Sequence, residues 1–247
     1  MLGNSPTKDP TITFLCDADI RQVFADMERK GYSCIPNFIA KDDLSEVQDF
    51  VEAIVEKSQH EYVVLKDRDA VQGTILDEIA GSPLFQSMFA QLFQLALGRP
   101  APMVTFYQIL RCLTGKGSAS HSLIFHYDSY LITALIPVTI PKSGLRGDFL
   151  LIPNSRKVRS SYIRNLVDKI LLDNRLTQAL LKKRAKMGER SITRIEMIPG
   201  NLYLFWGYRS VHTNEPCDPQ SVRATALFHF FDPHADSALK KRMKPGR

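Results

Sequence analysis

The stretch Phe125-His126-Tyr127-Asp128 ends a strand that we predict over residues 122–128. Residues two apart in a strand point to the same face, so we expect His126 and Asp128 to project together. One imidazole nitrogen and one carboxylate oxygen would then lie about one strand repeat apart, as two ligands of one metal ion do. Because an HxD triplet often arises by chance, this interpretation needs support from elsewhere in the chain.

A second histidine downstream supplies that support. The turn Pro199-Gly200-Asn201 precedes an apolar strand predicted over 202–206, and Val211-His212 follows it. Two histidines and one carboxylate form the facial triad of non-haem iron(II), which leaves three adjacent coordination positions open. The sequence therefore predicts a metal site of His126, Asp128 and His212, which are also the predicted catalytic residues. The open positions could take a bidentate 2-oxo acid and then dioxygen.

The chain contains another HxD triplet, His234-Ala235-Asp236, which serves as an internal comparison. It follows Pro233, leads into a polar and basic tail, and has no histidine after it. Its surroundings are not typical of a strand. We therefore interpret this second triplet as a chance occurrence.

A 2-oxo acid with a distal carboxylate also needs a cation, and a bidentate guanidinium is the best suited. Arg223 lies eleven residues after His212, beyond a turn-rich segment over 214–219 that returns the chain on a neighbouring strand. Thr225 shares a strand face with Arg223 and could add a hydroxyl to the same carboxylate. We predict Arg223, Thr225 and Thr133 as cofactor-binding residues, with Thr133 lining the site.

The order of elements favours an α+β protein with a β-sandwich or jelly-roll core, N-terminal flanking helices and a helical insertion. No glycine-rich turn of the Rossmann or P-loop kind is present. Helices are expected over 18–30, from Asp42-Asp43 onward and over 83–97, and a helix broken once over 159–187. Strands are expected at 31–38, 103–112, 122–128, 131–138, 148–152, 192–197, 202–206 and 223–231. The chain divides as one domain over 1–247, with a flexible N-terminus (1–15), a mainly helical flank (16–100), a β core (101–231) with its insertion (158–190) and a basic tail (232–247).

Residues Gly31–Phe231 resemble the phytanoyl-CoA dioxygenase-like branch of the iron(II)/2-oxoglutarate-dependent oxygenases. The matching pieces are the opening over 31–38, the His126-Tyr127-Asp128 triplet, the apolar strand and turn over 147–157, and His212 followed by Arg223. In the turn over 147–157, Asn154 and Arg156 replace the glycine and histidine of the family pattern. The resemblance implies a double-stranded β-helix, iron at His126, Asp128 and His212, and 2-oxoglutarate at Arg223.

The resemblance also shapes the expected reaction, in which iron(II), 2-oxoglutarate and dioxygen together oxidise an unactivated C–H bond. Halogenating relatives replace the metal-binding carboxylate with a small residue, so the presence of Asp128 favours hydroxylation. Desaturation, ring formation and demethylation remain open. The insertion over 158–190 is longer and more helical than the family pattern and leaves the substrate class undecided; it is interpreted as a lid or a dimer contact.

The expected partner is a small-molecule substrate, such as an amino acid, a natural-product intermediate or an acyl compound, and a homo-oligomer stays open. Two alternatives remain: a metal-binding β-sandwich that acts as a sensor without oxygenase activity, and a nucleic-acid-modifying oxygenase. The second is prompted by the net charge of +6. However, no aromatic residues interleave with the basic clusters, so nucleic acid is not the favoured partner.

The bulk composition of the 247 residues, 44% hydrophobic and 23% charged, is that of a globular protein. No apolar run is long enough to span a bilayer and no secretory signal is present, so we expect no membrane partner. The four cysteines are scattered and none forms a CxxC pair, which argues against a thiolate zinc site and fits a reduced, cytoplasmic setting. They are Cys16, Cys34, Cys112 and Cys217.

Overall fold

The structure is a computed structural model that describes residues 15–115 and 117–243. The expected flexible N-terminus over 1–15 falls almost entirely outside the described residues. The helices are α1 (Asp17–Lys30), α2 (Lys41–Lys57), η1 (Arg68–Val71), α3 (Ile75–Gly81), α4 (Pro83–Leu97), α5 (Gly117–Ser120), α6 (Tyr162–Asp173), α7 (Arg175–Lys186) and α8 (Ala238–Met243). The strands are β1 (Tyr32–Ile35), β2 (Val63–Lys66), β3 (Tyr107–Leu113), β4 (Ile132–Thr139), β5 (Phe149–Ile152), β6 (Thr193–Ile195), β7 (Leu202–Phe205), β8 (Val211–Asn214) and β9 (Arg223–Phe230).

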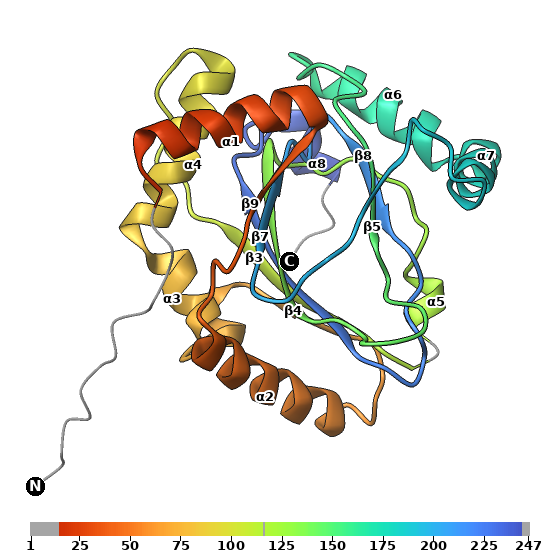
Figure 1. Cartoon of the computed structure of the whole chain (residues 1–247). Helices are drawn as coiled ribbons and strands as arrows, with labels where there is room; N and C mark the ends of the chain where they lie inside the picture. Colours follow the sequence, from red (N-terminus) through yellow and green to blue (C-terminus); the bar gives the residue numbers. More distant parts are fainter. Residues whose placement is uncertain (1–14, 116, 244–247) are drawn as a thin grey trace, which may run out of the picture.

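Two antiparallel sheets form the core of the protein (Figure 1). The larger has the strand order β1-β7-β4-β9-β3-β2, and the smaller has the order β6-β5-β8. Side chains from both sheets, among them Leu135 of β4, Phe149 of β5 and Phe205 of β7, form one buried cluster between them. The predicted α+β class with a double-stranded β-helix core is therefore confirmed.

Strand β9 shows how the period of two divides the larger sheet into two faces. Ala224, Ala226 and Phe228 join the large hydrophobic core on the outer face. The residues between them point to the inner face, where they line the space between the sheets; these are Arg223, Thr225, Leu227 and His229. One strand thus carries both core residues and candidate site residues.

Helices α1 to α4 cover the outer face of the larger sheet (Figure 1). Helix α4 illustrates how the sequence sets their limits: Ser82 caps its start by accepting a hydrogen bond from the Phe85 backbone N–H at 3.3 Å, and Pro83 occupies its first position. The helix ends at Gly98, whose φ of 66° is left-handed. The predicted helices over 18–30 and 83–97 are confirmed to within one residue.

The predicted broken helix over 159–187 is confirmed as α6 and α7, which stand together at one side of the molecule (Figure 1). The break lies at Asn174, whose side-chain oxygen accepts a hydrogen bond from the Thr177 backbone N–H at 2.9 Å and so caps α7. No helix among the described residues is long and apolar enough to cross a membrane.

The predicted strand over 122–128 is not formed. Leu123 has a φ of 54°, in the left-handed region. The segment contacts β8 through one isolated bridge between His126 and His212 and through one backbone bond, from the Leu123 N–H to the Asn214 carbonyl at 2.8 Å. The backbone N–H and C=O of Phe125 are bonded instead to the side chain of Gln178 on α7. A side chain from the insertion therefore replaces part of the expected ladder. Strands β2 and β8 and helix α3 were not predicted from the sequence.

Candidate metal centre

The three predicted metal ligands lie together in the space between the two sheets. His126 and Asp128 come from the segment between α5 and β4, and His212 comes from β8. His126 and His212 are directly paired, each backbone N–H bonding the other residue's carbonyl at 3.0 Å. The ligand atoms all lie within 4.8 Å of one another, and no other such group of metal-binding side chains occurs among residues 15–115 and 117–243.

The geometry directs one carboxylate oxygen and two imidazole nitrogens to a common point. Asp128 Oδ1 lies 3.4 Å from His212 Nε2 and 3.8 Å from His126 Nε2. The two imidazole rings have centroids 4.3 Å apart and are tilted by 57°. One carboxylate and two imidazoles grouped in this way are the donor set of a facial triad.

Both histidines are oriented by the backbone. The Nδ1 atom of His126 lies 2.9 Å from the Ile124 carbonyl, and that of His212 lies 3.1 Å from the Ser210 carbonyl. A carbonyl only accepts hydrogen bonds, so each ring donates through Nδ1–H and keeps its lone pair on Nε2. This is the arrangement of a metal-binding histidine whose second nitrogen fixes the tautomer.

Asp128 is held by a chain of polar side chains behind it. Thr133 donates its hydroxyl to Asp128 Oδ2 at 2.5 Å, and His229 Nδ1 lies 3.1 Å from the same hydroxyl. Because Thr133 donates to the carboxylate, its oxygen accepts from His229. This leaves Asp128 Oδ1 facing the two metal-binding nitrogens. The structure thus places Thr133 behind the metal ligand.

The charge state of Asp128 follows from these neighbours. Burial raises the pKa of its carboxyl, but the surrounding histidines, His212 first among them, act in the opposite direction and hold the pKa well below its ordinary value. The carboxyl is therefore ionised at neutral pH, as a metal ligand must be.

Gly207 makes the close approach to Asp128 possible. The Asp128 backbone N–H bonds the Gly207 carbonyl at 3.0 Å. A Cβ at Gly207 would overlap Thr133 Oγ1 and Asp128 Oδ2 and lie 3.0 Å from the Asp128 Cβ. Only glycine fits here because the backbone passes directly against the carboxylate.

Arg223 is a buried cation without an acidic partner. It is 3% exposed, its Nε donates to the Gly147 carbonyl at 2.8 Å, and it forms no ion pair with any described residue. Burial, and secondarily the positive charge of Arg111, lower its pKa to about 10, so it stays positively charged at neutral pH. A buried, charged guanidinium facing a cavity is suited to an anionic ligand.

Thr225 adds a second feature that points to a ligand. Its hydroxyl is buried and has no hydrogen-bond partner in the part of the chain that the structure describes. It lies on the same face of β9 as Arg223, two residues further along. A buried hydroxyl without a partner is costly unless a ligand satisfies it.

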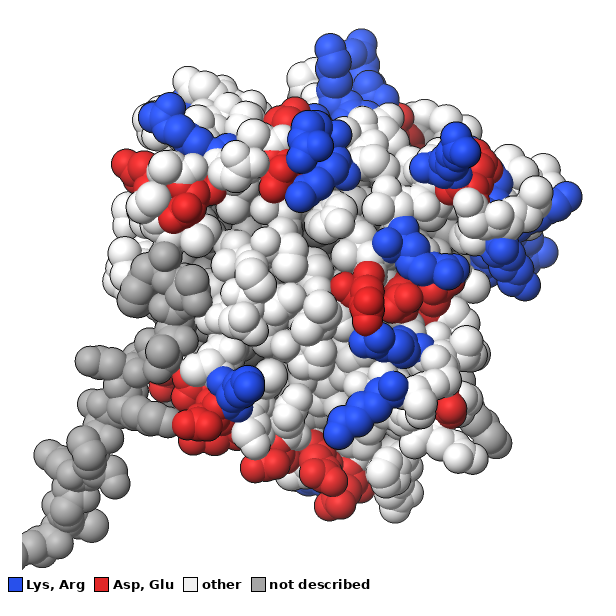
Figure 2. Space-filling view, viewed as in Figure 1, with Lys and Arg blue, Asp and Glu red and all other residues white. Residues whose placement is uncertain are grey.

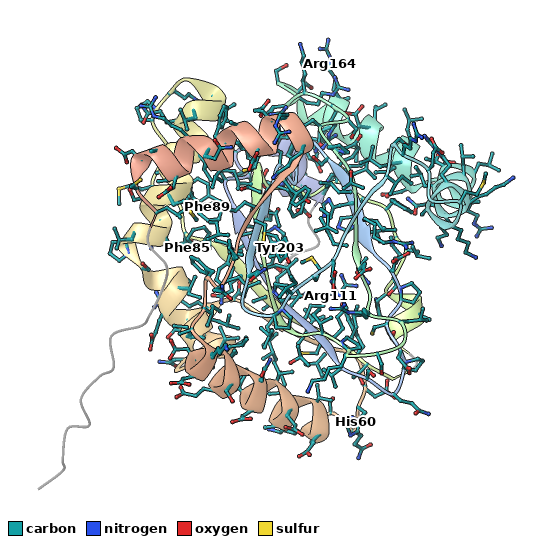
Figure 3. All side chains as sticks on the ribbon, viewed as in Figure 1. His60, Phe85, Phe89, Arg111, Arg164 and Tyr203 are labelled. Atoms are coloured by element: carbon teal, nitrogen blue, oxygen red, sulfur yellow. The ribbon has the colours of Figure 1, made fainter. Side chains whose placement is uncertain are left out.

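These groups line one cavity of about 290 Å³. Its wall combines the polar site with apolar side chains from both sheets, such as Leu135, Phe149 and Phe205. Arg111 of β3 also lines it and lies near the middle of the molecule in Figure 3. Asn214 of β8 also lines it.

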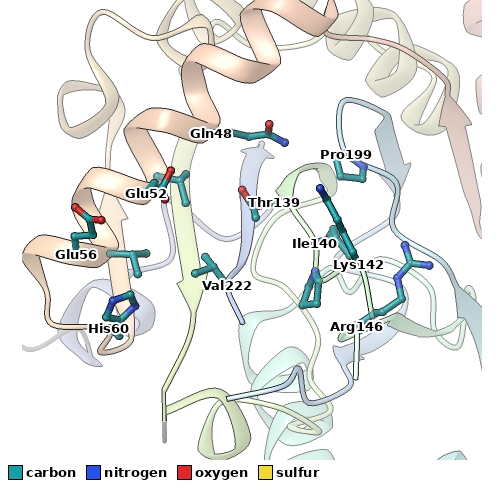
Figure 4. Close-up of a pocket in the computed structure, with 13 residues that line it drawn as sticks. Gln48, Glu52, Glu56, His60, Thr139, Ile140, Lys142, Arg146, Pro199 and Val222 are labelled. Atoms are coloured by element: carbon teal, nitrogen blue, oxygen red, sulfur yellow. The ribbon is translucent and has the colours of Figure 1, made fainter. Parts of the chain in front are cut away.

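A separate cavity of about 460 Å³ lies between α2 and the end of β4 (Figure 4). It carries Glu52, Glu56 and His60 on one side and Lys142 and Arg146 on the other. Although larger, it does not contain the metal-binding group of the described residues. We therefore place the functional site in the smaller cavity.

His234 and Arg209 make contacts with other side chains of the fold. His234, of the second HxD triplet, bonds the Tyr208 hydroxyl at 2.9 Å, away from the metal centre. Arg209 forms an ion pair with Glu28 at 2.5 Å. The roles of Gly207, Gly147 and Gln178 were not predicted, because nothing in their local sequence indicates which distant residue they contact.

No protein-family model matches the chain, and a search of curated proteins found no match either. Many solved structures are similar. A prolyl hydroxylase from Trichoplax adhaerens, in complex with a hypoxia inducible factor peptide fragment, matches with a TM-score of 0.56 and 16% identity over 90% of this chain and 93% of that one. HygX from Streptomyces hygroscopicus, with nickel and 2-oxoglutarate bound, matches with a TM-score of 0.57 and 12% identity over 84% and 85% of the two chains.

A third similar structure is SnoK, a non-haem α-ketoglutarate-dependent carbocyclase from nogalamycin biosynthesis, with a TM-score of 0.54 and 16% identity over 97% and 96% of the two chains. At these identities the likeness shows the fold, a double-stranded β-helix also found in iron- and 2-oxoglutarate-dependent oxygenases. The phytanoyl-CoA dioxygenase-like branch remains a prediction.

Proposed function

We propose that the protein is an iron(II)- and 2-oxoglutarate-dependent dioxygenase that hydroxylates an unactivated C–H bond of a small organic substrate. The observation that carries this proposal is the presence, in one cavity, of the His126, Asp128 and His212 set together with a buried Arg223 that has no acidic partner among the described residues. The similarity in fold to oxygenases that hold a metal ion and 2-oxoglutarate supports it.

The donor set fits iron(II). Imidazole and carboxylate ligands on one face suit non-haem iron and leave room for a bidentate keto acid and dioxygen. Hydrogen bonds from the chain itself orient both imidazoles, and the Thr133 hydroxyl holds Asp128 from behind. Such support fixes the positions of the ligand atoms.

The other end of the cavity fits 2-oxoglutarate. Arg223 would bind its distal carboxylate, and the unsatisfied Thr225 hydroxyl would donate a further hydrogen bond. Arg223 is in turn positioned by the Gly147 carbonyl, which accepts from its Nε and leaves its two terminal nitrogens for the ligand. Thr133, by its contact with Asp128, would position a metal ligand.

When bound, iron(II) with 2-oxoglutarate and dioxygen supplies the oxidising chemistry, and succinate and carbon dioxide are its by-products. The task of the chain is to hold these groups, to orient a substrate against them and to limit access of water. The apolar side chains of Leu135, Phe149 and Phe205 provide the dry wall of the cavity.

The size of the cavity limits the class of substrate. A volume of about 290 Å³ must also hold the co-substrate, which favours a small substrate or one that inserts only a short part of itself. Within the branch that the sequence resembles, amino acids, natural-product intermediates and acyl compounds are the candidates.

The testing experiment is an anaerobic titration of the purified protein with iron(II) and 2-oxoglutarate. A weak charge-transfer band in the visible spectrum would report keto-acid chelation to a facial-triad iron. We expect the band in the wild type and its loss in His212→Ala. In Arg223→Ala, half-saturation of the band should require a higher concentration of 2-oxoglutarate. Metal binding without any band would instead indicate a metal-binding module that is not an oxygenase.

A further inference from the structure

The insertion α6–α7 exposes apolar side chains that its own fold does not bury. Seven of the sixteen exposed large apolar side chains among the described residues lie between 163 and 187, and Leu176 and Met187 are 84% and 73% exposed. The seven are Ile163, Val167, Ile170, Leu171, Leu176, Leu180 and Met187. Apolar exposure on this scale marks an interaction surface.

The exposed residues form a stripe on each helix. On α6 they recur at Ile163, Val167 and Ile170–Leu171, and on α7 and its end at Leu176, Leu180 and Met187, which is helical spacing. The opposite sides of the helices are buried against the protein, through Leu172 on α6 and through Leu181 and Ala185 on α7. These helices therefore have two apolar faces, and only one of them packs against other residues in the part of the chain that the structure describes.

The insertion also carries the net charge of the whole protein. Of the 32 Lys and Arg residues of the chain, nine lie in residues 158–190, and of the 26 Asp and Glu residues, three lie there. The rest of the chain therefore has 23 basic and 23 acidic residues. Figure 2 shows Lys and Arg gathered over the region of α7, and Arg164 of α6 projects outward at the edge of the molecule in Figure 3. The basic character is thus local.

These basic side chains are free to meet a partner. Two of the three acidic residues are already paired, Asp168 with Arg156 and Arg159, and Glu189 with Arg184. The remaining basic residues of the insertion, apart from Lys169, form no ion pair or hydrogen bond with other described side chains; they are Arg164, Arg175, Lys182, Lys183, Lys186 and Arg190. On α7, helical spacing puts Arg175, Lys182 and Lys186 in a row beside the apolar stripe.

We propose that this surface, the exposed face of α6–α7, docks the protein on an anionic lipid membrane. The apolar stripes would enter the boundary between headgroups and acyl chains, and the basic row beside them would meet anionic headgroups. A twofold contact with a second copy would bring two basic rows together, which disfavours self-association through this face. The sequence-based expectation of no membrane partner considered only spanning segments and secretory signals, so it did not address this surface.

The experiment is vesicle flotation of the full chain with phosphatidylcholine vesicles that contain or lack phosphatidylserine. We expect flotation only with phosphatidylserine, and a decrease with added salt because exposed charges are screened. Equal binding to both kinds of vesicle, or no binding to either, would overturn the proposal.

Charge variants test the basic row. Lys182→Glu with Lys186→Glu should weaken binding at least about 20-fold, since each basic residue near an anionic surface contributes about fivefold. The matched control, Arg21→Glu with Lys57→Glu, makes the same charge change at exposed sites on α1 and α2 and should keep most of the binding. Equal losses in the two pairs would mean that only the net charge matters, and would contradict a defined docking face.

Apolar variants test the stripe. Leu176→Ser with Leu180→Ser should weaken binding by about tenfold, whereas Leu84→Ser with Leu145→Ser, at sites that are 56% and 60% exposed elsewhere, should not. Unchanged iron(II) affinity would show that each variant is folded. Sedimentation showing a dimer that only the stripe variants dissociate, or salt-sensitive binding to RNA or DNA without vesicle binding, would assign the surface to a second copy or to nucleic acid and refute a membrane role.

Discussion

His212 and Arg223 lie on strands β8 and β9, whereas His126 and Asp128 lie on a segment with no strand of its own. Strand β9 pairs with β3 and β4 along most of its length, and β8 pairs with β5. The His126–Asp128 segment has only one bridge to β8. It is held in addition by side chains from elsewhere, such as Gln178 on Phe125 and Thr133 on Asp128.

The site thus has a strand half, with His212 and Arg223, and a segment half, with His126 and Asp128. The two halves should respond differently to substitution. A ladder of backbone hydrogen bonds does not depend on the side chains of its residues, so a change near the strand half should affect only the side chain that it contacts and should leave the metal ligands in place. The segment half depends on individual side chains and on one glycine, so single substitutions behind it should reach the metal. The predictions below test this difference, beginning with the largest effect.

Gly207→Ala should damage the segment half most. The new methyl group would overlap the Asp128 carboxylate and the Thr133 hydroxyl, which forces the ligand out of place. We expect iron(II) affinity to fall by roughly 100-fold, measured by competition with a metal-binding dye. Gly188→Ala, whose added methyl meets no atom within 4 Å although its φ of 65° strains the backbone, controls for a glycine-to-alanine change away from the metal. Wild-type affinity in Gly207→Ala would show that the segment can shift without cost.

Gly147→Ala should damage the strand half at Arg223 alone. A Cβ there would lie 2.5 Å from the Arg223 Cδ, and Gly147 has a φ of 74°. We expect 2-oxoglutarate binding to weaken by about tenfold while iron(II) affinity stays within error, both followed in the anaerobic titration. Gly144→Ala, in the same loop and with a φ of 71°, controls for backbone strain. A parallel loss of iron(II) affinity would contradict the separation of the two halves.

Gln178→Ala removes the link from the insertion to the metal segment. Its amide nitrogen donates to the Phe125 carbonyl at 2.8 Å and its oxygen accepts from the Phe125 N–H at 3.0 Å, one residue before His126. We expect iron(II) affinity to fall by about tenfold. Gln48→Ala, which removes a similar amide bond to the Val138 carbonyl far from the metal, should leave it unchanged. Equal effects would indicate general destabilisation only.

The smallest expected effect is the contribution of His229 to the pH dependence of folding stability. Burial lowers its pKa, so in the folded protein it stays neutral at pH values where the unfolded chain takes up a proton. The metal-free protein should lose stability as pH falls below about 6.5, because the unfolded state then binds more protons. Urea unfolding at pH 7.5 and pH 5.5 measures this, and His229→Asn should lose less between the two. If His229→Asn lost as much stability as the wild type between the two pH values, the pH dependence would come from other histidines.

Much of the molecule could be predicted from local patterns. The helices over 18–30 and 83–97, the broken helix of the insertion and the strands around 131–138 and 223–231 follow from periodicity, caps and turns, which act over a few residues. The identities of the candidate ligands could also be predicted, since imidazole, carboxylate and guanidinium are the only groups that suit this chemistry. The similarity to solved structures confirms the fold.

Other features could be seen only in the tertiary structure. That His126 and Asp128 meet His212 without a regular strand depends on Gln178, more than fifty residues further along the chain. The need for glycine at 207 and 147 arises from contacts with Asp128 and Arg223, and the unpartnered Thr225 hydroxyl is defined by what surrounds it. Local sequence carries chemical identity and periodicity; close approach between distant segments is decided by packing, where an overlap of a single methyl group is enough to change the outcome.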